Sequence, residues 1–210
     1  MYQFVAPRDR RFAWASRRGT WSRDHIPRVC PECGASRKRR VSPLVLEWLP
    51  GSGLVPDFCW PGFNDEVVVS QRVRELLNGE IGGTRFLPIQ MWQNPRLGLL
   101  KRPRARLMPR VWLPYEGPPL WDLQTDAWCD LDLDHAGVLL AHRCSICGTD
   151  HYTALTNDRL LVDPSTWRGE ALFRLRQYPT LLYCTEQAKS LLEARGFTNA
   201  GFHLAGEIPE

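Results

Sequence analysis

"CSICG", residues 144–148, is the stretch that decides how this chain folds, because the same pattern occurs earlier as "CPECG", residues 30–34. A tight turn places both sulfurs of a CxxC pair on one side of the backbone, where two thiolates can bind one cation. The glycine after the second cysteine allows a positive φ, which turns backbone N–H groups toward the sulfurs. Two such pairs supply the four thiolates that a tetrahedral structural zinc ion prefers.

The two motifs are far apart in the sequence, whereas the knuckles of compact zinc ribbons are separated by about 15–20 residues. Only the fold can bring these pairs together. We predict one structural Zn²⁺ per chain, shared by Cys30, Cys33, Cys144 and Cys147. Two separate or mixed-ligand sites, or no metal at all, are the alternatives.

Histidines near the motifs are the rival ligands, namely His25, His142 and His151. An exposed or capping position is the simpler interpretation for each of them. The sequence leaves open whether any of the three joins the metal site.

The other cysteines do not indicate redox or catalytic chemistry. Seven cysteines, an odd number, fit a reduced protein better than a disulfide framework. Cys59, Cys129 and Cys184 have no partner at a ligand spacing and are predicted to be small core residues. A thioredoxin-like site needs its CxxC at the start of a helix, but "CSICGTDHY" continues into turn-forming residues. A zinc deaminase needs an H-x-E motif, which no histidine here begins.

The composition is that of an ordinary globular protein: 210 residues, 43% of them hydrophobic and 24% charged, with a net charge of +4. This charge is too small to indicate nucleic-acid binding by itself. No apolar run approaches the roughly 20 residues that a membrane-spanning helix needs. The first residues also lack the apolar core of a secretory signal. We therefore predict a cytoplasmic protein with no membrane partner.

A second internal similarity occurs at almost the same offset as the two knuckles. "FCWPGFNDEVVVSQRVRELL" (Phe58–Leu77) aligns without a gap over "FRLRQYPTLLYCTEQAKSLL" (Phe173–Leu192). Each segment has a short apolar run typical of a strand, and then a hydroxyl residue suited to cap a helix, Ser70 or Thr185. A second strand is expected soon after each helix, at "TRFLPI" and at "AGFHLA".

The helices that follow these caps are predicted to bury one face each. Their apolar residues follow the i, i+3, i+4 spacing of an amphipathic helix, at Val73, Leu76 and Leu77 and at Ala188, Leu191 and Leu192. Asn78–Gly79 and Gly196 are the expected C-terminal stops.

These patterns predict an α+β fold in which two related strand–helix–strand halves are joined by a four-cysteine zinc-knuckle clamp. We place the N-terminal half at 1–94, a Pro-rich and acidic connector at 95–137, and the C-terminal half at 138–210, within one compact unit. A chance likeness between two ordinary strand–helix units is the alternative, because identities between the segments are few.

Two basic clusters, "RKRR" (37–40) and the run 101–110, could mark a nucleic-acid surface. A zinc ribbon with a basic patch is a combination found in nucleic-acid-binding proteins. No stacking aromatics are interleaved with these charges, however, as single-strand binding requires. A solvated surface is the simpler interpretation, and nucleic acid is not the partner that we expect.

A row of five carboxylates is our candidate partner-binding surface: Asp122, Asp126, Asp130, Asp132 and Asp134. In "CDLDLDH", strict alternation predicts an antiparallel strand with leucines on one face and aspartates on the other. Such a row complements a basic protein such as a nuclease, although a solvated strand face is the simpler alternative. No nucleophile, base or phosphate loop accompanies the row, so we predict no catalytic residue and no enzyme.

The chain resembles the myxobacterial paralogous double-CXXCG family. The likeness rests on the two CxxCG motifs, on the stretch from "DFCWPGF" to "VVVSQRVRELL", and on the ending "LFRLRQYPTLLYCTEQAKSLLEARGFTNAGFHLAGEI". It covers most of the chain from about Cys30 onward. Members are described as immunity proteins against swarm-inhibition toxins, and their cysteines correspond to Cys30, Cys33, Cys144 and Cys147.

The resemblance implies a cytoplasmic protein that binds and neutralises one cognate toxin in kin discrimination. Toxin-binding residues do not carry over, because such surfaces diverge between paralogues. A zinc-ribbon nucleic-acid-binding regulator is the alternative. A metalloenzyme is the third hypothesis, and it would need an open zinc position that four cysteines do not leave.

Overall fold

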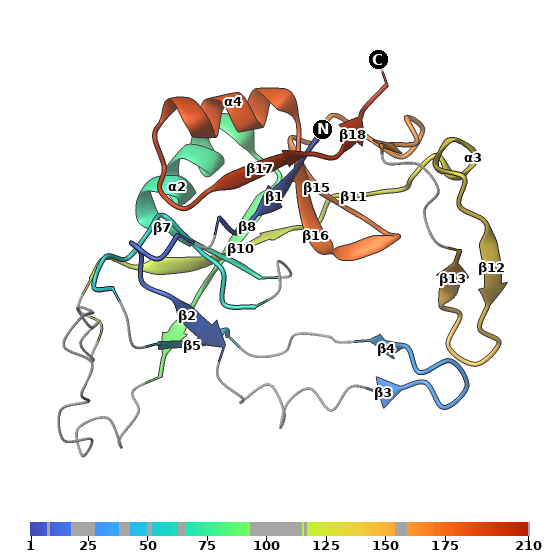
Figure 1. Ribbon diagram of the computed structural model, residues 1–210, viewed down its shortest axis with the longest axis horizontal. Helices are drawn as coiled ribbons and strands as arrows, with labels where there is room; N and C mark the ends of the chain where they lie inside the picture. Colours follow the sequence, from blue (N-terminus) through green and yellow to red (C-terminus); the bar gives the residue numbers. More distant parts are fainter. Residues whose placement is uncertain are drawn as a thin grey trace.

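The computed structural model describes residues 1–7, 9–17, 28–37, 43–49, 52–62, 66–92, 115, 117–153 and 159–209, and only the backbone of residues 28, 29, 36 and 37. These residues form a mixed α+β fold of many short strands and few helices (Figure 1). His25, the basic run 101–110 and residues 38–40 of the "RKRR" cluster lie outside the described residues.

Two sheets form the centre of the fold, and in both the order of the strands differs from their order in the sequence. The five-stranded sheet has the order β11 (Trp128–Cys129), β15 (Leu172–Leu175), β16 (Tyr178–Cys184), β1 (Tyr2–Val5) and β17 (Gly201–Leu204). The four-stranded sheet has the order β6 (Phe58–Cys59), β7 (Val67–Ser70), β10 (Leu120–Thr125) and β8 (Thr84–Pro88). All neighbours in both sheets are antiparallel except β11 and β15, which are parallel.

A helix follows one strand of each sheet, and each helix starts at the predicted cap. α2 (Gln71–Leu76) follows β7, and Ser70 Oγ accepts a hydrogen bond from the backbone N–H of Val73 at 3.4 Å. α4 (Glu186–Ala194) follows β16, and Thr185 Oγ1 accepts from the N–H of Ala188 at 3.2 Å. Each hydroxyl satisfies an N–H that has no partner within its helix.

The two helices end differently. α4 is followed by Gly196, which has the positive φ (+61°) expected of a C-terminal stop. The predicted stop at Asn78–Gly79 is wrong, because α2 continues as a π-helical turn, η1 (Leu77–Ile81), and ends at Gly82. The N–H of Gly82 donates to the carbonyl of Leu77 at 2.9 Å, which is the i→i+5 hydrogen bond of a π-helical turn. This turn extends the helix beyond Leu76, and Leu77 remains buried.

The order of strands around the helices is the same in the two sheets. β7 and β8 flank α2 in sequence, and β10 separates them in the sheet. β16 and β17 flank α4, and β1 separates them. Residues 120–125, which the sequence placed in a connector, therefore form an interior strand of the four-stranded sheet.

The two sheets share one hydrophobic core, and Figure 1 shows α2 and α4 lying together over it. Its fully buried members come from both sheets and from both helices: Phe4, Phe58, Val67, Val69, Val73, Leu77, Leu123, Leu172, Leu182, Cys184, Ala188 and Leu192. The predicted helix faces are buried in it, with Leu191 only partly buried. Long-range packing of this kind, rather than helix propensity, stabilises such short helices.

A buried carboxylate also links the two sheets. Asp57 Oδ2 accepts hydrogen bonds from the backbone N–H and the hydroxyl of Thr198, both at 3.0 Å, and Oδ1 accepts from Ser70 Oγ at 2.7 Å. Because Ser70 caps α2, this network ties the start of that helix to the loop before β17. The hydrogen bonds offset the cost of burying the charge.

Smaller sheets surround this centre. β2 (Ala15–Arg17), β5 (Val45–Trp48) and β9 (Gln90–Met91) form a three-stranded sheet that packs on Val68 and Leu120 of the four-stranded sheet. β14 (Leu160–Leu161) pairs in parallel with β18 (Gly206–Glu207). Among the described residues, no helix has the length and apolar character needed to cross a membrane.

Candidate metal centre and acidic pocket

Two hairpins carry the CxxCG motifs, and their turns meet at one end of the molecule, away from the large sheets (Figure 1). The first pairs β3 (Arg28–Val29) with β4 (Ser36–Arg37), and the second pairs β12 (Leu140–Arg143) with β13 (Asp150–Tyr152). The paired residues that flank the cysteines occupy equivalent positions in the two hairpins: Val29 pairs with Ser36, and Arg143 pairs with Asp150.

The two knuckles also have the same backbone hydrogen bonds. The N–H of Gly34 donates to the carbonyl of Cys30, and that of Gly148 donates to the carbonyl of Cys144, both at 2.9 Å. The two glycines have φ of +69° and +67°, which is the left-handed conformation predicted from the motif.

The fold brings the two cysteine pairs together, as predicted. The Sγ atoms of Cys30 and Cys144 lie 3.6 Å apart, as do those of Cys33 and Cys147. All four sulfurs lie within 4.8 Å of one another, so they are close enough to hold one metal ion. Cys30 and Cys144 are buried, and Cys33 and Cys147 are half-buried.

His142 and His151 are not members of this four-sulfur cluster. His142 and His151 are paired across the second hairpin, and their rings stack with centroids 4.4 Å apart and planes 4° from parallel. Stacking of a cross-strand pair stabilises a hairpin without a metal. His25 lies outside the described residues.

Glu32 connects the two knuckles, a role that was not predicted from the sequence. Its Oε2 accepts hydrogen bonds from Ser145 Oγ at 3.0 Å, from the backbone N–H of Ile146 at 3.3 Å and from Cys144 Sγ at 3.1 Å. A carboxylate of the first knuckle thus orients the second. Its position between the two cysteines of "CPECG" is the sequence feature from which this role could have been predicted.

The surroundings of the second knuckle shift its two thiols in opposite directions. Hydrogen bonds from the side chain and backbone of Thr149 lower the pKa of Cys147 to about 6. The backbone N–H of Cys147 lowers the pKa of Cys144, but the Glu32 carboxylate and burial outweigh it and raise that pKa to about 12. Metal ligation requires both thiolates, so binding releases protons from this knuckle.

The remaining cysteines are core residues, as predicted. Cys59, Cys129 and Cys184 are all buried. Burial raises the pKa of Cys59 and of Cys184 to about 12, and that of Cys129 to about 11. Such thiols stay protonated near neutral pH and are poor nucleophiles.

The segment "CDLDLDH" is not the continuous strand that alternation predicted. β11 ends at Cys129, and one helical turn, α3 (Leu133–Ala136), follows. Asp132 Oδ1 accepts from the N–H of His135 at 3.0 Å, and Gly137 ends the turn with φ of +60°. A capping aspartate and a left-handed glycine favour this turn over an extended chain.

The five aspartates of the predicted row have different surroundings. Asp122 is 1% exposed, because β10 is an interior strand, and it accepts a hydrogen bond from Gln124 Nε2 at 2.8 Å. Asp126 is exposed and pairs with Arg85 at 3.4 Å. The other three, Asp130, Asp132 and Asp134, line one open pocket of about 580 Å³.

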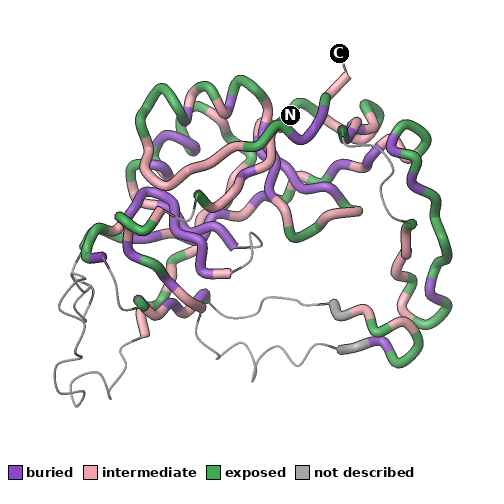
Figure 2. The backbone as a smooth tube through the Cα atoms, in the orientation of Figure 1, coloured by how far each residue is buried: buried purple, intermediate pink, exposed green. Residues whose placement is uncertain are grey.

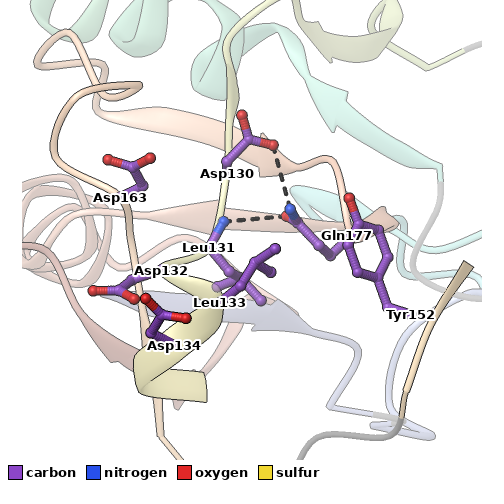
Figure 3. A pocket seen from close by; sticks show the side chains of 8 residues that line it. All are labelled: Asp130, Leu131, Asp132, Leu133, Asp134, Tyr152, Asp163 and Gln177. Carbon is purple, nitrogen blue, oxygen red and sulfur yellow. Dashed lines mark hydrogen bonds between the residues drawn. The ribbon is translucent and has the colours of Figure 1, made fainter. Parts of the chain in front are cut away.

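This pocket combines the end of the aspartate row with residues from three other segments (Figure 3). Its other lining residues are Leu131, Leu133, Tyr152, Asp163 and Gln177. Gln177 Oε1 accepts from the N–H of Leu131 at 3.2 Å, and its Nε2 donates to Asp130 at 3.3 Å. No sequence signal joins Tyr152, Asp163 and Gln177 to the row, because only tertiary pairing brings them together.

Comparison with known proteins adds no relative. No protein-family model matches this sequence, and no curated protein matches it. The resemblance to the double-CXXCG family therefore stays a prediction based on motifs.

Replacing Glu32 with alanine is expected to weaken Zn²⁺ affinity by about tenfold, because residues that orient metal ligands contribute on that order. Glu32→Gln keeps an oxygen that can accept from Ser145 and Ile146, so its loss should be smaller. Competition with a chromophoric chelator for Zn²⁺ measures both variants. Native affinity in Glu32→Ala would show that the bridge does not orient the second knuckle.

Proposed function

We propose that this protein is a non-catalytic immunity protein that binds and neutralises a cognate bacterial toxin in the cytoplasm, and that one zinc ion clamps its two knuckles. The observation that supports this most directly is that one hairpin contributes both to the four-cysteine cluster and, through Tyr152, to the acidic pocket. A metal clamp can therefore stabilise a surface suited to a protein partner.

The donor set supports zinc as the metal. Four thiolates at about 2.3 Å from a tetrahedral zinc ion lie about 3.8 Å from one another, and the two short sulfur–sulfur distances here are 3.6 Å. Four protein ligands complete the tetrahedron and leave no position for a substrate or a reactive water. When bound, zinc would crosslink hairpins that are distant in sequence, which is a structural role.

The acidic pocket is the part of the surface that we propose faces the toxin. Asp130 is paired with Arg176, so Asp132, Asp134 and Asp163 supply the charge that remains for a partner. Carboxylates gathered in one pocket complement a basic protein and reject an acidic one. Toxin neutralisation by a rigid face also needs no chemistry, and rigidity lowers the ordering cost of binding.

We further propose that the two halves of the chain are related by duplication. Three features support this interpretation: matching knuckle hairpins, caps at Ser70 and Thr185 that align in sequence, and the same strand order around α2 and α4. A nucleic-acid-binding regulator is the alternative function. It depends on basic clusters that, apart from the backbone of Arg37, lie outside the described residues, so no structural observation favours it.

Survival of bacteria tests the proposed function. The C-terminal domain of the protein encoded by the adjacent reading frame would be expressed with and without this chain, and with the Asp132→Asn/Asp134→Asn/Asp163→Asn variant. We expect rescue and co-purification with the native chain, and weaker rescue with the variant. A neighbour that kills regardless of this chain, or is harmless, would contradict the proposal.

A further inference from the structure

The second hairpin is largely exposed, and several of its exposed side chains are apolar. Within the described chain β12 pairs only with β13, and all four residues of β12 are exposed (Figure 2). Three of the eight large hydrophobic side chains that are exposed in the described chain lie here: Leu139 (68%), Leu140 (48%) and Ile146 (63%). Exposed apolar side chains that lie together on one face mark an interaction surface, so the face on which each of these residues lies decides its role.

The register of the hairpin shows which of these residues adjoins the acidic pocket. Leu140 lies directly opposite Tyr152, and directly opposed residues of an antiparallel pair point to the same face. Tyr152 lines the pocket, so Leu140 extends the same surface. Leu139, one residue earlier in the extended chain, points to the other face.

The charge on this face is negative. Figure 3 places the carboxylates of Asp132, Asp134 and Asp163 on one side of the pocket and the ring of Tyr152 on the other. The cation nearest along the hairpin, Arg143, is already held by Asp150 through two hydrogen bonds of 2.5 and 2.9 Å. This face therefore combines the apolar side chain of Leu140 with the carboxylates of Asp132, Asp134 and Asp163, for which the described part of the chain supplies no ion pair.

We propose that Leu140 and Tyr152, together with the pocket carboxylates, form a docking surface for a protein segment that presents an arginine or lysine beside an apolar side chain. The cation enters the pocket between the carboxylates and the face of Tyr152, where electrostatic and cation–π attraction add. The apolar side chain covers Leu140. This inference rests on the proposed function, because it names the chemistry of the toxin segment that the protein contacts.

The four-cysteine site determines whether Leu140 and Tyr152 are held beside the pocket carboxylates. At one end the hairpin is held to the first knuckle through Cys144 and Cys147, and at the other the N–H of Val138 bonds to the carbonyl of Leu133 at 3.0 Å. No other strand in the described part of the chain pairs with it. The metal therefore fixes Leu140 and Tyr152 relative to the carboxylates, and its removal weakens docking although no cysteine touches the partner.

A designed peptide tests the surface without the toxin. The probe is the peptide Arg-Leu-Arg-Leu-Arg-amide with fluorescein coupled to its N-terminal amine, and the control probe is the same labelled peptide with Asp in place of Arg. Fluorescence anisotropy reports binding to the full, zinc-loaded chain. We expect the basic peptide alone to bind. Leu140→Ser should weaken binding about fivefold or more, since it removes apolar contact area, whereas Leu139→Ser should stay within about twofold. Both positions are exposed, and circular dichroism checks that both variants fold.

Several results would overturn the proposal. Equal binding of the basic and acidic peptides would exclude the charged pocket, and equal effects of Leu140→Ser and Leu139→Ser would exclude this face. Unchanged binding after zinc is removed by a chelator would exclude the role of the metal. If the chain fails to rescue bacteria but binds the basic peptide, the immunity function is refuted and the docking surface stands. If the chain rescues bacteria but does not bind the peptide, the docking surface is refuted and the immunity function stands.

Discussion

Replacing Cys144 with serine is expected to abolish tight metal binding and to release both knuckle hairpins. Structural zinc sites have apparent binding free energies of about 10–16 kcal/mol, and Cys144 is a buried member of the four-sulfur cluster. None of the three hydrophobic core clusters includes a residue of either knuckle. Without the metal, the hairpins therefore have little to hold them against the rest of the molecule.

Metal analysis and limited proteolysis measure this outcome. The Cys144→Ser protein should contain no zinc, be cleaved within residues 28–37 and 138–153, and aggregate more readily than the native chain. Cys59→Ser is the matched control, because Cys59 is buried outside the cluster and this variant should retain its zinc. A Cys144→Ser protein that keeps one zinc and resists cleavage would contradict the clamp.

Truncating Phe58 to alanine is expected to cost about 3–5 kcal/mol of unfolding free energy, as measured for large aromatic residues in cores. Phe58 is 0% exposed, and its ring centroid lies 6.0 Å from that of Phe4 and 6.3 Å from that of Phe197. These neighbours belong to the five-stranded sheet and to the loop before β17. The truncation would therefore open a cavity between the two sheets.

Urea denaturation of Phe58→Ala gives this free energy directly. Leu54→Ala is the control, because Leu54 is exposed and surface substitutions usually change stability by less than about 0.5 kcal/mol. If Phe58→Ala unfolded at nearly the same urea concentration as Leu54→Ala, the two sheets would not share a core.

The features that the sequence predicted correctly depend on local chemistry. Ser70 and Thr185 cap helices because a hydroxyl there meets the N–H three residues later, whatever the rest of the chain does. The meeting of the knuckles was predictable because two thiolate pairs satisfy one tetrahedral metal. Both inferences need only residue type and spacing.

The features that the sequence missed depend on distant parts of the chain. Asp122 is buried because β10 enters the sheet between β7 and β8, a pairing that no local pattern encodes. The pocket requires Asp163 and Gln177 from separate segments. Over "LDLDH", alternation and a capped helical turn compete, and the cap at Asp132 decides in favour of the turn.

Native mass spectrometry of the purified chain shows directly whether the four cysteines of the two distant motifs share one zinc ion. We expect the mass of one chain plus one zinc, and loss of that zinc when any one of the four cysteines is replaced by serine. Two zinc ions per chain, none in a folded protein, or a zinc that survives replacement of a motif cysteine would contradict it.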